Sequence, residues 1–573
     1  MRMKKNVEVR CLNNGKEYKF APGTSLEAFA AKACPVARDK KGREYPVFAA
    51  IVDHKLKELS YEMFYSHEVE FIGYNHPDGR RTYFRSLSFL LQHAVRKLFP
   101  RLILVIDHAL PSGYYCELLE NRKDEDGRTV VYPVSLAEID ALQVKMRETV
   151  AADLPFVKTK MLAEEAEALF DGGLQYYKSR LTKSLGRYFC SVYYLDGIPD
   201  SFHGPLVPST GCLDVFRLLP FGRGFCLQYP DSEDITRVIP TRPQVKLAEM
   251  FRRYSDWCFT TRIIGVSSLN QRLLSGGAVE LINLCEARHE RDYAEIADRI
   301  YAARDHVKIV FIAGPSSSGK TSSSLRLAQQ CKVLGLNPKV IELDNYFVER
   351  DETPRDEDGD FDFEALEAMD LRLLGEQLNR LLAGEEVEIP RYDFKQGRKF
   401  FEGNMLRLEE RDILIMEGIH ALDPAMVPSV DQNRIFRVYA SALTSLNVDE
   451  NNCISTSDNR LLRRMVRDNR VRGISPEATL LRWASVRRGE NRNIFPFQEN
   501  ADALFNSALL YELPMLKYYA EPLLRRILPS SPAYPEAVRL LKFLDYIVAL
   551  QPAEIDCIPP TSIMREFIGG QTL

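Results

Sequence analysis

The residues best suited to chemistry form one short run that is rich in glycine and serine. The run consists of Gly314, Pro315, Ser316, Ser317, Ser318, Gly319, Lys320 and Thr321, and it matches the pattern GxxxxGK[ST] in full. Small residues let consecutive backbone N–H groups surround a phosphate, while the lysine reaches the terminal phosphates and the threonine hydroxyl serves Mg²⁺. An apolar strand pattern precedes the run and a helical pattern follows it, so the helix dipole favours the anion. The sequence therefore predicts nucleotide binding.

Two acidic residues stand at the ends of apolar runs that are typical of strands. Asp344 follows residues 339–343, and Glu417 ends a run that begins at residue 413. Open α/β sheets bind ligands at the carboxyl ends of their strands, so Asp344 is suited to take a proton from an attacking hydroxyl. The alternative for Asp344 is a loop-capping aspartate. We interpret Glu417 as a Mg²⁺ partner of Thr321.

Arginines crowd one predicted amphipathic helix in the C-terminal half of the chain. They are Arg460, Arg463, Arg464, Arg467, Arg470 and Arg472. Surface arginines usually serve solvation or RNA contact, but in an ATP-dependent phosphotransferase a mobile arginine lid that neutralises transferring phosphate explains them better. Residues 391–394 and 360–363 mix aromatic and acidic side chains, which suits stacking on a base and hydrogen bonding to sugar hydroxyls. Ordinary packing is the alternative for both segments.

The elements that must position these residues alternate as strand, turn and helix after residue 308, which predicts a parallel α/β sheet. The strand candidates are Val307–Ala313, Lys339–Leu343, Asp412–Met416 and Ile435–Ala440.

The first 72 residues show a different pattern of strand and helix signals. Val7, Val9 and Cys11 alternate with polar residues, Asn14-Gly15 is a hairpin signal, and Thr24 is expected to cap a short helix. Together with further strand signals these features suggest a β-grasp sheet. We expect four units: a β-grasp domain at 1–72, an α+β domain at 73–238, a helical connector at 239–305 and the phosphate-loop α/β domain at 306–573.

Composition limits the remaining options. The chain has 573 residues with 76 Lys and Arg against 80 Asp and Glu, so the net charge of -4 excludes a globally basic nucleic-acid binder. No stretch approaches the ~18 uninterrupted apolar residues of a membrane helix, and no apolar signal-peptide core is recognisable. The 11 cysteines form no CxxC pair. We expect a cytoplasmic protein with reduced thiols and no membrane partner.

From residue 306 onward, the motifs and their order resemble the uridine kinase/phosphoribulokinase family. The resemblance implies that Asp344 is the general base for a nucleoside 5′-hydroxyl and that Thr321 and Glu417 hold Mg²⁺. It further implies that Asp362 holds ribose hydroxyls, that Tyr392 contacts the base, and that Tyr346 lies at the substrate. The implied lid arginines are Arg464, Arg467 and Arg472. The family usually carries a histidine shortly after its Tyr-Asp-Phe motif, but here residues 395–398 read Lys-Gln-Gly-Arg. The resemblance therefore leaves the base specificity open.

The N-terminal half resembles threonyl-tRNA synthetase, with a TGS domain at residues 6–72 and an editing-type domain from residue 85 to about 230. The editing site needs two histidines one helical turn apart plus a cysteine and a further histidine. The matching positions are Arg85, Phe89, Phe202 and Leu206, and His203 is one residue out of register. We therefore expect His203 to be structural and tRNA editing to be lost.

These observations lead to an ATP- and Mg²⁺-dependent kinase of a small-molecule hydroxyl, with a nucleoside as the expected substrate. Two alternatives stay open. One is a tRNA- or ribosome-associated regulator that uses the phosphate loop as an ATP-binding switch, with RNA contact through the N-terminal domains. The other is a kinase for another hydroxyl, such as that of a sugar phosphate. Related kinases often self-associate, so a homo-oligomer is expected by resemblance.

Overall fold

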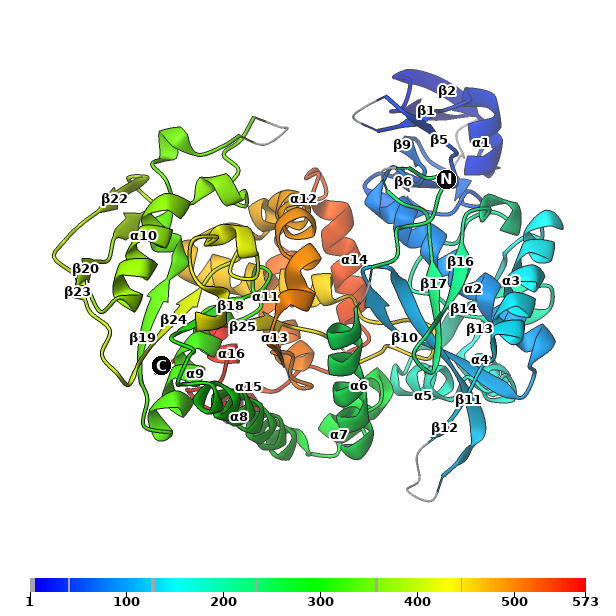
Figure 1. Cartoon of the computed structure of the whole chain (residues 1–573). Coiled ribbons are helices and arrows are strands. Elements are labelled where there is room, and N and C mark those ends of the chain that lie inside the picture. Colours follow the sequence, from blue (N-terminus) through cyan, green and yellow to red (C-terminus); the bar gives the residue numbers. More distant parts are fainter. Residues whose placement is uncertain are drawn as a thin grey trace.

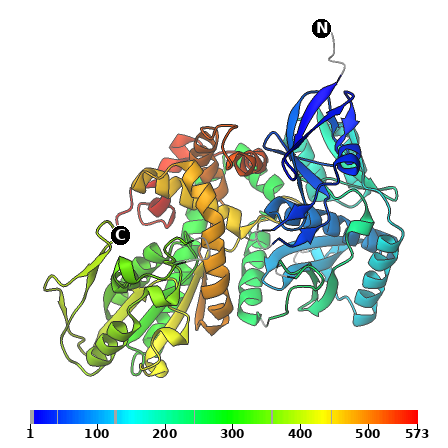
Figure 2. The ribbon, with the colours of Figure 1, turned by 90° about the horizontal axis from the view of Figure 1, so that it is seen from above.

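The computed structural model describes residues 6–39, 42–124, 129–232, 234–242, 244–355, 359–444 and 446–573. The first five residues of the predicted β-grasp unit lie outside this part of the chain. Figures 1 and 2 show an N-terminal half, blue to cyan, beside a C-terminal half, green to red. No helix in the described part of the chain is long and apolar enough to cross a membrane.

The N-terminal module is a mixed five-stranded sheet with one helix. Its strand order is β2-β1-β9-β6-β7. The elements are β1 (Val7–Cys11), β2 (Lys16–Phe20), α1 (Leu26–Ala33), β6 (Ala49–Val52), β7 (Lys55–Lys57) and β9 (His67–Ile72), with the short strands β3 (Thr24–Ser25), β4 (Ala37–Arg38), β5 (Glu44–Tyr45) and β8 (Glu62–Met63). The expected cap Thr24 is wrong: Ser25 caps α1, because its side chain accepts from the Ala28 amide while Thr24 bonds back to Ala21.

The second segment places a long helix beside two antiparallel sheets. The larger sheet has the order β10-β11-β17-β16 with β12 beside β11, and the smaller one has the order β13-β14-β15. The strands are β10 (Leu102–Leu110), β11 (Gly113–Lys123), β12 (Thr129–Tyr132), β13 (Val157–Leu162), β14 (Phe189–Leu195), β15 (Ile198–Asp200), β16 (Arg217–Phe221) and β17 (Gly224–Gln228). The helices are α2 (Pro77–Leu98), α3 (Leu136–Ala151), α4 (Ala163–Gly172) and α5 (Tyr176–Ser184).

Three helices follow in the segment predicted as a connector, namely α6 (Val245–Thr260), α7 (Val266–Leu274) and α8 (Ala278–Ala302). Buried residues of all three belong to one apolar core with the C-terminal half. This shared core makes the segment part of the C-terminal packing as well as a link.

The C-terminal half is built on a parallel five-stranded sheet with the order β19-β24-β18-β25-β26. The strands are β18 (Ile309–Ala313), β19 (Asn337–Glu342), β24 (Asp412–Glu417), β25 (Ile435–Ser441) and β26 (Ala503–Asn506). Its helices are α9 (Lys320–Val333), α10 (Leu371–Leu382), α11 (Thr456–Arg472), α12 (Pro476–Asn493), α13 (Glu512–Leu524), α14 (Tyr534–Leu544), α15 (Pro552–Asp556) and α16 (Met564–Ile568). Two small ladders pair β20 (Val387–Glu388) with β23 (Met405–Leu406) and β21 (Arg391–Asp393) with β22 (Arg398–Phe400). The multidomain α+β and α/β prediction is confirmed, whereas the domain boundaries stay a prediction.

Candidate active site

The phosphate loop joins the central strand β18 to helix α9, and its two glycines are required by close contacts. A Cβ on Gly314 would lie 2.0 Å from the backbone oxygen of Ala440 on the neighbouring strand. Gly319 has φ +81°, and a Cβ there would lie 2.2 Å from Cδ1 of Ile563. Only glycine fits both positions, so the loop keeps its backbone curved at the amino end of α9.

The predicted Mg²⁺ pair meets directly at the end of the loop. Thr321 Oγ1 donates to Glu417 Oε1 at 2.6 Å, although the two residues come from different parts of the sequence. Burial raises the pKa of Glu417 to about 7, opposed by Lys320 and reinforced by Asp344. Glu417, Thr321 and Lys320 therefore bring a carboxylate, a hydroxyl and an ammonium group together at the end of the phosphate loop.

The loop residues fit a bound phosphate chain with Mg²⁺. The hydroxyls of Ser317 and Ser318 are buried and have no hydrogen-bond partner in the described part of the chain. Among the described residues, no group of three or more His, Cys, Asp or Glu side chains forms a metal cage. The oxygens of Thr321 and Glu417 are donors that suit Mg²⁺, because this ion is typically held by one or two protein oxygens together with substrate phosphates.

Asp344 lies just after β19, in the 3-10 turn Leu343–Tyr346. The sheet order sets Asp344, Glu417 and the phosphate loop above the ends of β19, β24 and β18 in turn. Surrounding protein raises the pKa of Asp344, and Lys320 and Arg472 oppose that rise. A carboxylate with a raised pKa so near the phosphate loop is suited to receive a hydroxyl proton.

The predicted lid arginines approach the loop to different degrees. Arg464 Nη1 donates to Ser316 Oγ at 2.9 Å, which puts its guanidinium on the phosphate loop. Arg467 pairs with Asp468 at 2.8 Å, and Arg472 pairs with the same carboxylate at 3.5 Å. Arg464 is therefore the arginine of this set that contacts the loop directly.

Two other arginines of α11 are held in buried ion pairs, which corrects the expected mobile lid, and Arg463 Nη1 also donates to the Ser317 carbonyl of the phosphate loop at 3.5 Å. Arg460 and Arg463 are both fully buried. Arg460 forms two hydrogen bonds with Glu490, at 2.7 and 2.6 Å, and Arg463 Nε donates to Glu512 at 2.8 Å. Since leucines of the same helix also enter the core, α11 is anchored on this side rather than free to swing.

The predicted substrate residues divide in a similar way. Tyr346 is 1% exposed, and its hydroxyl donates to Gln377 Oε1 at 2.8 Å, so it packs in the core instead of facing a substrate. Tyr392 packs against Phe347, but its hydroxyl is buried without a hydrogen-bond partner in the described part of the chain. Asp362 lies 3.5 Å from Arg492 of α12. The roles of Tyr392 and Asp362 stay predictions.

Sequence reasoning missed two glutamates beside the loop. Glu490 accepts a hydrogen bond from the Ser316 amide at 3.0 Å, so it supports the loop from α12. Burial and the neighbouring Glu490 raise the pKa of Glu364 to about 7, while Arg464 and Lys320 lower it. The only sequence signal for Glu490 was an acid among the arginines of α12, which is also typical of a solvated helix face.

The part of the chain that carries this site is similar to a known protein family. Residues 309–509 match the model of the Phosphoribulokinase / Uridine kinase family. The match covers β18 to the end of β26 and includes the phosphate loop, Asp344, Glu417 and α11. It supports a phosphate-loop kinase that acts on a hydroxyl-bearing substrate.

Other similarities concern separate parts of the chain. A protein described as a possible uridine kinase from Bacillus stearothermophilus is 20% identical, with a TM-score of 0.24, and the alignment covers 37% of this chain and 99% of that one. The N-terminal part is similar to threonine–tRNA ligases, at 30% identity to that of Nitratidesulfovibrio vulgaris over 29% of this chain and 27% identity to that of Clostridium kluyveri over 40% of it. The matches span only 24% and 34% of those two ligases.

In the ligase-like segment, three of the four positions compared with an editing site carry apolar side chains. Phe89 and Leu206 are buried in one cluster, and the ring of Phe202 lies 5.5 Å from that of Phe89. Burial lowers the pKa of Arg85 to about 10, and its guanidinium donates to the Pro205 carbonyl at 3.1 Å. Both ring nitrogens of the half-buried His203 are shielded from solvent, and its ring lies 4.3 Å from that of Tyr546 in the C-terminal half. The loss of tRNA editing stays a prediction.

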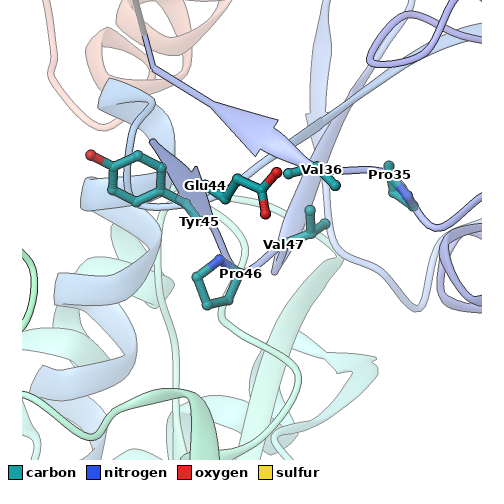
Figure 3. A pocket seen from close by; sticks show the side chains of 6 residues that line it. All are labelled: Pro35, Val36, Glu44, Tyr45, Pro46 and Val47. Atoms are coloured by element: carbon teal, nitrogen blue, oxygen red, sulfur yellow. The ribbon is translucent and has the colours of Figure 1, made fainter. Parts of the chain in front are cut away.

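A shallow hollow lies elsewhere, on the N-terminal module. It encloses about 360 Å³ between the chain segments around Pro35 and Pro46. Figure 3 shows its six lining side chains, among which Glu44 is the single charged one. This lining offers neither a nucleophile nor a cationic group for phosphate, so the hollow adds nothing to the phosphate-loop site.

Proposed function

We propose that this protein transfers the terminal phosphoryl group of ATP, with Mg²⁺, to the 5′-hydroxyl of a nucleoside. The observation that carries the proposal is the convergence of Lys320, the Thr321–Glu417 pair and Asp344 above adjacent strand ends. A base, a metal-binding pair and a phosphate cradle in one place are the parts that phosphoryl transfer to a hydroxyl requires.

Each residue has a distinct task in the proposed reaction. The loop amides and Lys320 hold the phosphates, and Thr321 and Glu417 would hold Mg²⁺, which neutralises charge on the phosphates when bound. Asp344 orients the substrate hydroxyl and accepts its proton as the oxygen attacks. The Arg464 guanidinium, next to Ser316, stabilises negative charge on the transferring group.

The nucleoside assignment depends on the aromatic and acidic residues that follow Asp344 in the chain, above all Tyr392 and Asp362. Tyr392 N donates to Asn345 Oδ1 at 3.3 Å, so the aromatic and acidic segment lies next to the proposed base. Asp362 supplies a carboxylate for ribose hydroxyls. Residues 395–398 carry no histidine, so a sugar phosphate is the second substrate class to test.

The test is a substrate screen with Mg²⁺ and ATP. Ribonucleosides, deoxyribonucleosides and pentose phosphates are offered to the purified protein, and both ADP release and product mass are recorded, with Lys320→Ala as the blank. We expect one nucleoside to become its 5′-monophosphate. Turnover of a pentose phosphate alone would replace the nucleoside assignment. Binding of ATP without any turnover would favour the RNA-associated regulator, which the ligase-like N-terminal part motivates.

RNA contact through the N-terminal half and self-association are further proposals that this screen leaves to separate measurements. Gel-shift titration with tRNA at several salt concentrations tests the first, because contacts to phosphates weaken steeply with salt. Sedimentation of the full chain tests the second.

A further inference from the structure

One loop of the kinase-like half is buried in the N-terminal half. We name Asn447–Cys453 the bridging loop; its two ends pair with each other in an antiparallel bridge, and its tip carries Asp449 to Asn452. Asp449, Glu450 and Asn451 are each 2% exposed. Such polar side chains are rarely buried without partners, so the contacts of the tip show what it does.

The bridging loop covers the free edge of strand β10. The Ile106 amide donates to the Glu450 carbonyl at 2.8 Å, and the Asn447 side chain donates back to the Ile106 carbonyl at 3.2 Å. Asn451 Nδ2 reaches the Leu104 carbonyl at 3.4 Å. The loop therefore continues the edge of a sheet that belongs to the other half of the molecule.

The Glu450 carboxylate binds the amino end of helix α5. It accepts hydrogen bonds from the amides of Tyr177 and Lys178, at 2.6 and 3.1 Å. A carboxylate at this position satisfies two amides that have no partner within the helix and interacts favourably with the helix dipole. The Lys178 ammonium, itself buried, pairs with Asp200 and lies 3.7 Å from Asp449. Both halves of the molecule thus contribute charges to one closed network.

Both ends of the bridging loop lead directly to the phosphate loop. Upstream, strand β25 brings the Ala440 carbonyl against Gly314. Downstream, Ser455 follows Cys453 by two residues and caps α11, and that helix carries Arg464 to Ser316. In Figure 1 the yellow segment between β25 and α11 extends toward β10. Asn447 follows Ala440 by 7 residues and Arg464 follows Glu450 by 14, so the same stretch of chain contacts the N-terminal half and the phosphate loop.

We propose that the N-terminal half supports the kinase site by holding the bridging loop, which in turn positions α11 and Arg464. Docking of the loop and nucleotide binding therefore strengthen each other. Glu450 is the positioning residue in this linkage. The proposal rests on nucleotide binding at the phosphate loop, as given under the proposed function. Linkage is reciprocal, so a factor by which nucleotide strengthens docking is the same factor by which docking strengthens nucleotide binding.

The first test uses the unmodified full chain and amide hydrogen exchange, with and without Mg²⁺ and a non-hydrolysable ATP analogue. We expect slower exchange in the phosphate loop and also, by about tenfold, at the Ile106, Tyr177 and Lys178 amides. The β1–β2 hairpin, remote from the bridging loop, serves as the internal control and should not change. Protection of the phosphate loop without any change at those three amides overturns the linkage. Failure of the phosphate loop itself to gain protection overturns nucleotide binding and the linkage together.

The second test compares Glu450→Gln with Glu376→Gln, the same chemical change at an exposed ion pair on α10. We expect the dissociation constant of the ATP analogue to rise about tenfold in Glu450→Gln and to stay at the wild-type value in Glu376→Gln. The nucleotide-induced protection of α5 should disappear at the same time. If Glu450→Gln does not fold, Asn451→Ala, which removes the hydrogen bonds of this side chain to the Leu104 carbonyl and from the Lys178 ammonium, both at 3.4 Å, should give a smaller loss of about threefold. Unchanged affinity in folded variants, with α5 still protected by nucleotide, refutes the linkage.

Discussion

Glu490→Gln should destabilise the C-terminal half more than its conservative appearance suggests. Glu490 is fully buried and accepts hydrogen bonds from Arg460, from Arg487 at 2.8 Å and from the Ser316 amide at 3.0 Å. Glutamine keeps the volume but removes the charge, so the buried Arg460 guanidinium loses its counterion. Burial already lowers the pKa of Arg460 to about 10, and Glu490 opposes that shift.

The size of the effect follows from the buried charge. Removing one partner of a buried ion pair costs about 3–5 kcal/mol, because the other charge stays in a poorly solvated environment. For a folding unit of about 270 residues, this corresponds to a fall in melting temperature of roughly 6–10 °C. The double variant Arg460→Met/Glu490→Gln removes both charges and should regain at least half of that loss.

A local probe is needed because a chain of several domains does not unfold in one step. Trp483 lies on α12, and its indole N–H donates to Ser457 on α11 at 3.2 Å. Fluorescence melting in a Trp257→Phe background would follow this region alone, since the chain has 2 tryptophans. A melting temperature of Glu490→Gln within 1 °C of its parent would refute the reasoning, as would a double variant less stable than the single one.

Further predictions address the site and the interface between the halves. Asp344→Asn should lower kcat by about 10²-fold or more with little change in ATP affinity, measured by steady-state kinetics and titration calorimetry; wild-type turnover would remove Asp344 from the base role. Burial raises the pKa of Glu450 to about 7, so the Glu450 carboxyl of the folded chain keeps its proton up to about that pH, whereas the unfolded chain releases the proton at lower pH. The free energy of unfolding should therefore fall by up to about 3 kcal/mol more in the wild type than in Glu450→Gln between pH 5 and 8, and equal pH slopes in urea unfolding would contradict this. Tyr346→Phe should cost about 1 kcal/mol of stability through the lost bond to Gln377 and leave KM for the substrate unchanged, and a raised KM would return Tyr346 to the substrate side.

The parts of the site that were predictable from the sequence are those with strong local signals. The phosphate loop combines a fixed residue pattern with an apolar strand before it, and Glu417 ends a continuous apolar run, which a buried parallel strand requires. The structure then brings Thr321 and Glu417 within hydrogen-bond distance, as that pattern implied.

The parts that were missed depend on contacts between distant segments. Arg460 and Arg463 look like surface arginines because their partners, Glu490 and Glu512, lie 30 and 49 residues further along the chain. The bridging loop is a run of polar residues that would normally be read as a solvated turn. It is buried because another half of the molecule supplies its hydrogen-bond partners, and no local pattern records that.

The claim that this protein phosphorylates a small-molecule hydroxyl is tested most directly without choosing a substrate in advance. The purified protein, Mg²⁺ and ATP labelled with ¹⁸O in its terminal phosphoryl group are incubated with a desalted extract of cell metabolites, and all products are examined by mass spectrometry. We predict one metabolite that gains a labelled phosphoryl group with the wild type and not with Lys320→Ala. Label recovered only in inorganic phosphate, from a protein that binds ATP, would contradict the account.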